Sequence, residues 1–262
     1  MMDLWQTIVL GIIEGITEFL PISSTGHLLI AEHWLGARSE LFNVAIQAGA
    51  ILAVVFIYWQ RLLSLFTHLG ERASRDYLAK LLLAFMITSI GGFIATRHGF
   101  KLAESLLPIA LALIIGGVAI LIIERLVAGR APSSDVTWKV AFWVGTCQIL
   151  AAIFPGTSRS ASTIFAAMLA GLTARPAATE FAFLVGIPTM FAATGYELLK
   201  TRGETAGEDW GALAIGFVVS GVVAFIAVKW LLRYIQSHRF TLFAWYRIVF
   251  GAGVLALALW SH

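Results

Sequence analysis

The sequence contains little charge and almost no cysteine. Only 13% of its 262 residues are charged and 59% are hydrophobic, whereas soluble domains carry about a quarter charged residues. A single cysteine, Cys147, excludes an internal disulfide framework and a cysteine-based metal cluster. No stretch alternates polar and apolar residues with the period of two found in membrane-barrel strands. The chain is therefore expected to be an integral membrane protein built from helices.

The positive charges lie mainly in loops. A net charge of +3 and a pI near 9.2 could suggest nucleic-acid binding. The Lys and Arg residues, however, gather in the loops between apolar runs. This distribution follows the positive-inside rule, so no nucleic-acid partner is expected. The basic loops 60–80, 124–139 and 229–240 are predicted to be cytoplasmic, which places both termini outside.

Apolar runs separated by loops predict ten helical segments. They are residues 4–20, 24–36, 41–59, 77–96, 103–124, 138–154, 158–171, 178–199, 210–233 and 241–260. A spanning helix needs about 20 residues, and segments 24–36 and 158–171 are too short. Each follows a modest helix and a Pro-containing polar turn, which predicts a hairpin that enters the membrane and returns. The expected fold is an all-α polytopic membrane protein, one domain over 1–262, with six spanning helices and two re-entrant hairpins.

An internal repeat supports this arrangement. At an offset of 134 residues, "GIIEGITEFLPISST" aligns with "GTCQILAAIFPGTSR". The aligned pairs include Gly11 with Gly145, Glu14 with Gln148, Pro21 with Pro155 and Ser24 with Ser158. Each half, approximately 1–128 and 138–262, then holds one hairpin and three spans, and an odd number of spans inverts the second half. Inverted repeats with interrupted helices bring the two turns together near the membrane midplane.

Two carboxylates lie one helical turn apart in the first hairpin. Glu14 and Glu18 share a helix face with two glycines, which permit close backbone approach. A carboxylate at the membrane centre costs about 2.5–3.5 kcal/mol, so the pair needs a compensating cation. One candidate is a divalent ion, Mg²⁺ or Ca²⁺, bound by Glu14 and Glu18. The other is Arg159, the only arginine that the sequence marks as strongly buried.

The two turns combine the features of an anion site. Ser23, Ser24 and Thr25 open one short helix and Ser158 opens the other, so each turn offers free amides, hydroxyls and the positive end of a helix dipole. Arg159 adds a guanidinium, and phosphate fits this combination best.

A nucleophile and a proton acceptor accompany the anion site. His27 lies three residues after Ser24 on the same helix face and can exchange protons near neutral pH. Hydroxyl, imidazole, carboxylates and a phosphate clamp are the parts of a phosphoryl-transfer enzyme.

Together these motifs resemble the undecaprenyl-diphosphate phosphatase family, also called bacitracin-resistance proteins. The resemblance rests on Glu14-x-x-x-Glu18, "PISSTGH" and "PGTSRSAST", and covers essentially the whole chain, although Ala161 replaces a glycine common in the second motif. It implies an enzyme of the bacterial inner membrane that hydrolyses C55 polyprenyl diphosphate to polyprenyl phosphate and phosphate, recycling the carrier lipid of cell-wall synthesis. The family's functional positions match Glu14, Glu18, Ser24, His27, Ser158, Arg159 and Thr163.

The expected reaction begins with attack by Ser24 on the terminal phosphorus. His27 or Glu18 takes the proton of Ser24, and direct attack by an activated water stays open. The diphosphate is expected to reach the site from the outer, periplasmic side, with its prenyl tail between helices. The expected substrate ligands are Ser23, Thr25, Gln47, Ser158, Arg159, Ser160 and Thr163.

A transporter or flippase of a lipid phosphate is the alternative function, because broken helices in inverted repeats recur in secondary transporters. A transporter needs Arg159 and the helix N-termini, but it does not need Ser24 and His27 on one face. The expected partners are the lipid substrate and the bilayer, and the sequence leaves a homodimer open.

Overall fold

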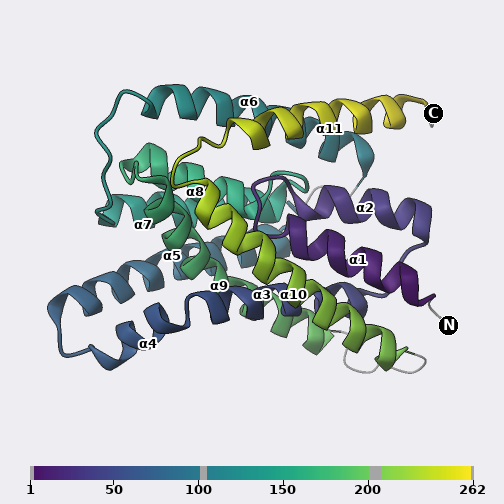
Figure 1. The fold of residues 1–262 in the computed structure, drawn as a ribbon, viewed down its shortest axis with the longest axis horizontal. Helices are drawn as coiled ribbons and strands as arrows, with labels where there is room; N and C mark the ends of the chain where they lie inside the picture. Colours follow the sequence, from purple (N-terminus) through teal and green to yellow (C-terminus); the bar gives the residue numbers. More distant parts are fainter. Residues whose placement is uncertain (1–2, 101–104, 201–207, 261–262) are drawn as a thin grey trace.

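The computed structural model describes residues 3–100, 105–200 and 208–260, and this part of the chain contains eleven helices and no strand (Figure 1). They are α1 (Leu4–Thr17), α2 (Ser24–Leu35), α3 (Glu40–Ile57), α4 (Trp59–Thr67), α5 (Arg72–Arg97), α6 (Leu106–Val127), α7 (Trp138–Ile153), α8 (Arg159–Ala170), α9 (Arg175–Lys200), α10 (Trp210–Tyr234) and α11 (Thr241–Trp260).

Six of the described helices are long and apolar enough to cross a membrane: α3, α5, α6, α9, α10 and α11. The predicted all-α polytopic fold with six spanning helices is therefore confirmed. The shorter pairs α1–α2 and α7–α8 occupy the positions predicted for the two hairpins. That they are re-entrant, and that the two halves form inverted repeats, stay predictions.

The predicted number of ten segments is wrong, because residues 60–80 are mostly helical and contain all but the first residue of α4. The predicted segment 41–59 ends where the apolar run ends, and residues 60–80 were predicted to be a basic loop, but an amphipathic helix needs only one apolar face. In α4 this face buries Leu65.

Two predicted helices also begin earlier in the structure, α5 at Arg72 and α9 at Arg175. Arg175 is anchored by two hydrogen bonds to Glu124, of 2.9 and 2.5 Å, which hold the first turn of α9 against the end of α6. The start predicted at residue 103 for the fifth segment lies outside the described residues, and α6 is described from Leu106.

The two ends of the described chain lie at the same end of the molecule, on the right in Figure 1, whereas α4 lies at the opposite end. An even number of spans requires this arrangement. It also separates the basic segment around α4 from the termini, as the predicted topology demands.

Small residues bring α1, α3 and α10 into backbone contact. A Cβ at Gly15 would lie 2.7 Å from the carbonyl oxygen of Ser220, and one at Gly49 would lie 2.2 Å from that of Phe217. Membrane helices associate through such close approaches. This packing buries the carboxylate-bearing face of α1 and places α3 beside it.

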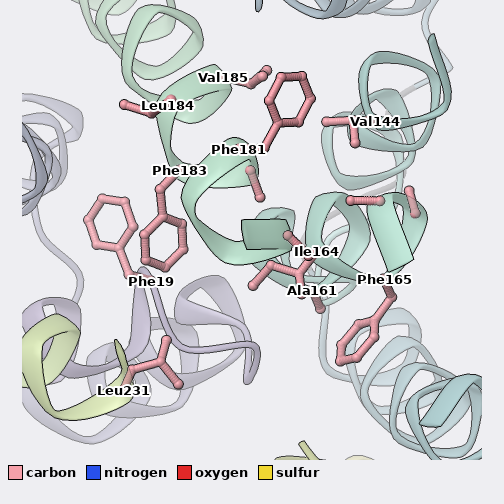
Figure 2. Close-up of a cluster of buried hydrophobic side chains, with 14 of the residues drawn as sticks. Phe19, Val144, Ala161, Ile164, Phe165, Phe181, Phe183, Leu184, Val185 and Leu231 are labelled. Carbon is pink, nitrogen blue, oxygen red and sulfur yellow. The ribbon is translucent and has the colours of Figure 1, made fainter. Parts of the chain in front are cut away.

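Buried apolar side chains pack the two hairpins against α9. Figure 2 shows Phe19, from the first turn, beside Phe183 of α9, with ring centroids 5.2 Å apart in an edge-to-face arrangement. Ile164 and Phe165 of α8 belong to the same buried cluster. The first turn and α8 therefore pack against one common helix, α9.

Candidate active site

Each hairpin turn ends in a serine with unusual backbone geometry. Ser23 and Ser158 are the N-caps of α2 and α8, with φ of 76° and 71°. A non-glycine residue in this region costs about 1–3 kcal/mol, and such strain is typical of functional sites. The predicted alignment paired Ser24 with Ser158, but the backbone pairs Ser23 with Ser158. The register shifts by one because the second turn has one more residue between its proline and its N-cap.

Both turns line one cavity of about 190 Å³. Three helices complete its wall, with Gln47 from α3, Ala151 from α7 and Met190 from α9. The predicted site residues that line it are Glu18, Ser23, Ser24, Thr25, Gln47, Ser158 and Arg159. The structure therefore brings the two motifs together, and the N-termini of α2 and α8 border the same cavity.

A chain of hydrogen bonds joins the first turn to the second inside this cavity. The Ser24 hydroxyl donates to Glu18 Oε2 at 2.5 Å, and Arg159 donates to Glu18 Oε1 at 3.3 Å. The side chains of Glu18 and Arg159 are only 9% and 16% exposed. Glu18 is thus placed to accept the proton of Ser24, while Arg159 neutralises the carboxylate and keeps further N–H donors for a phosphate.

His27 does not line the cavity. Its Nδ1 donates to the carbonyl oxygen of Ser23 at 2.6 Å, so its Nε2 accepts from the Tyr246 hydroxyl at 2.6 Å when the ring is neutral. The ring stacks on Phe250, with centroids 4.2 Å apart. Both ring nitrogens are engaged, which leaves Glu18, rather than His27, as the group in contact with Ser24.

Ser160 and Thr163 are buried and bind main chain rather than the cavity. The Ser160 hydroxyl donates to the carbonyl oxygen of Leu20 at 2.9 Å, linking the second hairpin to the first turn. The Thr163 hydroxyl bonds to the carbonyl oxygens of Arg159 and Ser160, at 2.9 and 3.1 Å. Their predicted role as phosphate ligands is not visible in this arrangement, and it stays a prediction.

Glu14 is fully buried, and neither of its carboxylate oxygens accepts a hydrogen bond from the residues that the structure describes. It lies close enough to Glu18 and Arg159 to interact electrostatically with both. A carboxylate buried without a hydrogen bond is costly unless a proton or a cation neutralises it. Among the described residues, no three or more His, Cys, Asp or Glu side chains lie together so that they could hold one metal ion. Two carboxylates nevertheless suit a hard divalent ion such as Mg²⁺, which completes its coordination with water and substrate phosphate.

Arg247 of α11 was missed by the sequence interpretation, which treated Arg159 as the only buried arginine. Arg247 is 0% exposed. Its guanidinium donates to the carbonyl oxygens of Pro21 at 3.3 Å, Gly156 at 3.2 Å and Thr157 at 3.1 Å, and it also bonds two carbonyl oxygens of α6. Arg247 therefore ties both turns together. The signal was an arginine within the apolar segment 241–260, but main-chain partners leave no mark in a sequence.

Gly186 of α9 supports the position of Arg159, because a Cβ there would lie 2.1 Å from Arg159 Nη1. We expect Gly186→Ala to displace the guanidinium and reduce phosphate release by about 100-fold, since a shift of about 1 Å in a positioned group has an effect of this size. The protein should still fold, because a flexible side-chain end can move. Gly253→Ala, where a Cβ meets nothing within 4 Å, is the matched control. Equal activity of the two variants would contradict this role.

Comparison with known proteins identifies the family of this chain over nearly its whole length. A family described as "Bacitracin resistance protein BacA" matches residues 7–253. An undecaprenyl-diphosphatase of Rhizobium etli (strain CIAT 652) is 62% identical over 259 residues, which cover 98% of each chain. One of Xanthomonas oryzae pv. oryzae (strain PXO99A) is 57% identical over 263 residues, or 99% of this chain and 98% of the relative. This chain therefore belongs to the BacA family of bacitracin resistance proteins.

Proposed function

We propose that this multi-pass membrane protein hydrolyses undecaprenyl diphosphate to undecaprenyl phosphate and inorganic phosphate. Its relatives, named undecaprenyl-diphosphatase, support the substrate and the reaction. The observation that carries the mechanism is the 2.5 Å hydrogen bond from Ser24 to Glu18 in a cavity that also contains Arg159. A hydroxyl that donates to a carboxylate beside a guanidinium supports attack by Ser24 on a bound diphosphate.

The reaction proceeds as two displacements at the terminal phosphorus. Ser24 Oγ attacks this phosphorus as its proton passes to Glu18, and the bond to the bridging oxygen breaks, releasing undecaprenyl phosphate. A water then attacks the phosphoseryl phosphorus, the bond to Ser24 Oγ breaks, and Glu18 returns the proton to that oxygen. Arg159 and the N-termini of α2 and α8 stabilise the charge that develops on the phosphoryl oxygens.

The test is phosphate release from undecaprenyl diphosphate by the purified protein in detergent, where no gradient exists. Hydrolysis is expected. Its absence, with gradient-driven movement of lipid phosphate after reconstitution into vesicles, would favour a transporter or flippase instead.

A divalent cation completes the proposal, with Glu14 and Glu18 as its protein ligands. When bound, such an ion neutralises charge on the carboxylates and on the substrate phosphates. The complete burial of Glu14 beside Glu18 supports this assignment.

Excess chelator is expected to stop phosphate release, and Mg²⁺ or Ca²⁺ should restore it. Glu14→Gln should raise the metal concentration needed for half-maximal activity at least about tenfold, because it removes one anionic ligand. The exposed Glu71→Gln should leave that concentration unchanged. Full activity in excess chelator would contradict the metal site. The two carboxylates would then serve only in proton transfer and in pairing with Arg159.

We further propose that the protein lies in the inner membrane of a bacterium, with the catalytic cavity open to the periplasmic side. The distribution of Lys and Arg among the loops supports this orientation. A homodimer stays a prediction.

Labelling with a membrane-impermeant maleimide tests the orientation in a Cys147→Ser background, in cells whose outer barrier is permeabilised. The exposed Ala37→Cys, between α2 and α3, should react. The exposed Arg130→Cys, between α6 and α7, should react only after the inner membrane is lysed. The reverse pattern would move catalysis to the cytoplasmic side.

A further inference from the structure

A second cavity, of about 490 Å³, adjoins the catalytic cavity. We refer to it as the α5–α9 groove, because most of its lining comes from these two helices. Ala193 lines both cavities. In addition, Ala152 of the groove directly follows Ala151 of the catalytic cavity, and Thr189 of the groove directly precedes Met190. The groove therefore continues from the place where the diphosphate would bind.

The lining of the α5–α9 groove is mostly small or apolar. A Cβ at Gly92 would meet nothing within 4 Å, which shows that the glycine faces open space. Thr88 and Thr189 are two of the polar side chains in the wall, and both hydroxyls accept from Gln148 and donate to carbonyl oxygens of their own helices. The wall therefore offers an apolar surface to a ligand, although it contains hydroxyl groups.

The groove also has a polar end. Arg97, the last residue of α5, and the exposed Tyr196 of α9 both line it. Arginine and tyrosine are typical of the boundary between hydrocarbon and water. Both lie in the helix halves that lead to the predicted periplasmic side, so the groove faces the leaflet from which the substrate is expected.

Two other apolar cavities lie outside the α5–α9 groove. One lies between α3 and α10 and is lined by Val222 and Phe225, and the other lies beside α6 and is lined by Leu111 and Ile115. Within the described part of the chain, neither shares a lining residue with the catalytic cavity. The second turn borders the α6 cavity at Pro155 and Thr157, and Arg247 donates to the carbonyl oxygen of Thr157.

We propose that the α5–α9 groove binds the part of the prenyl chain nearest the diphosphate and guides the rest into the lipid between α5 and α9. This assignment rests on the proposed function. A linear apolar chain fits because it must leave the catalytic cavity through an apolar opening, and the α5–α9 groove is the apolar cavity that shares a wall with it.

The first test fills the groove and compares two substrates with the same head group. Gly92→Phe should raise the KM for undecaprenyl diphosphate about tenfold or more, because a ring then occupies the place of the chain. Hydrolysis of isopentenyl diphosphate, which carries only five carbons, should change by less than about twofold. Val222→Phe and Leu111→Phe, which fill the other two cavities, are the matched controls and should leave both substrates unaffected. A KM raised by a control variant but not by Gly92→Phe would overturn the assignment.

The second test uses the unaltered protein and needs no turnover. A prenyl diphosphate with a photoreactive group on its first isoprene units should cross-link to peptides of α5 and α9. Cross-links confined to α3, α10 or α6 would overturn the assignment while leaving hydrolysis intact. Absence of phosphate release from both substrates would instead remove the proposed function, and the cross-linking pattern would still report where the chain binds.

Discussion

Ser24→Ala is expected to reduce phosphate release from undecaprenyl diphosphate by at least about 1,000-fold, the scale of losses when a nucleophile is removed. The variant lacks the oxygen that attacks phosphorus but keeps the cavity walls. Ser24 makes one side-chain hydrogen bond among those described, to Glu18, so the protein should remain folded in detergent. Initial rates with saturating substrate and the melting temperature in detergent measure the two effects separately.

Thr146→Ala is the matched control for Ser24→Ala. It also removes one hydroxyl, which bonds to the carbonyl oxygen of Phe142 within its own helix and does not line the cavity. Its activity should stay near that of the unaltered protein. Near-normal hydrolysis by Ser24→Ala would eliminate the covalent route and favour attack by water.

Arg159→Lys is expected to lose about 100- to 1,000-fold in kcat, the usual cost of removing a preorganised donor from a developing oxyanion. Lysine keeps the positive charge, but it cannot hold Glu18 and a phosphate with one planar fork of N–H groups. The rate should therefore fall even though the charge of the cavity is unchanged. Exposed Arg125→Lys, outside the site, is the control. Full activity of Arg159→Lys would reduce Arg159 to a counter-charge for Glu18.

The sequence predicted the spanning helices well because length and apolar composition decide whether a helix crosses a membrane. It failed at α4, where a short amphipathic helix carries no long apolar run. It also paired the wrong serines. The local conformation shared by Ser23 and Ser158 depends on the length of each turn, and an alignment of similar residues does not measure that length.

The catalytic motifs could be found from the sequence because Glu18, Ser24 and Arg159 are polar groups in apolar surroundings. The role of each residue in the proposed reaction could not be predicted from the sequence. A spacing of three residues put His27 on the same helix face as Ser24, but its hydrogen bonds to Ser23 and Tyr246 turn the ring toward α11. Such tertiary partners are fixed only when distant helices pack.

The central claim is that Ser24 carries the phosphoryl group between the lipid and water. The stereochemistry at phosphorus tests it most directly. The substrate is prepared with a terminal thiophosphate made chiral by oxygen isotopes and is hydrolysed in isotopically labelled water. Two in-line displacements, the first by Ser24 and the second by water, each invert the phosphorus and together predict net retention in the released thiophosphate. Net inversion would contradict the account, because it requires a single displacement by water.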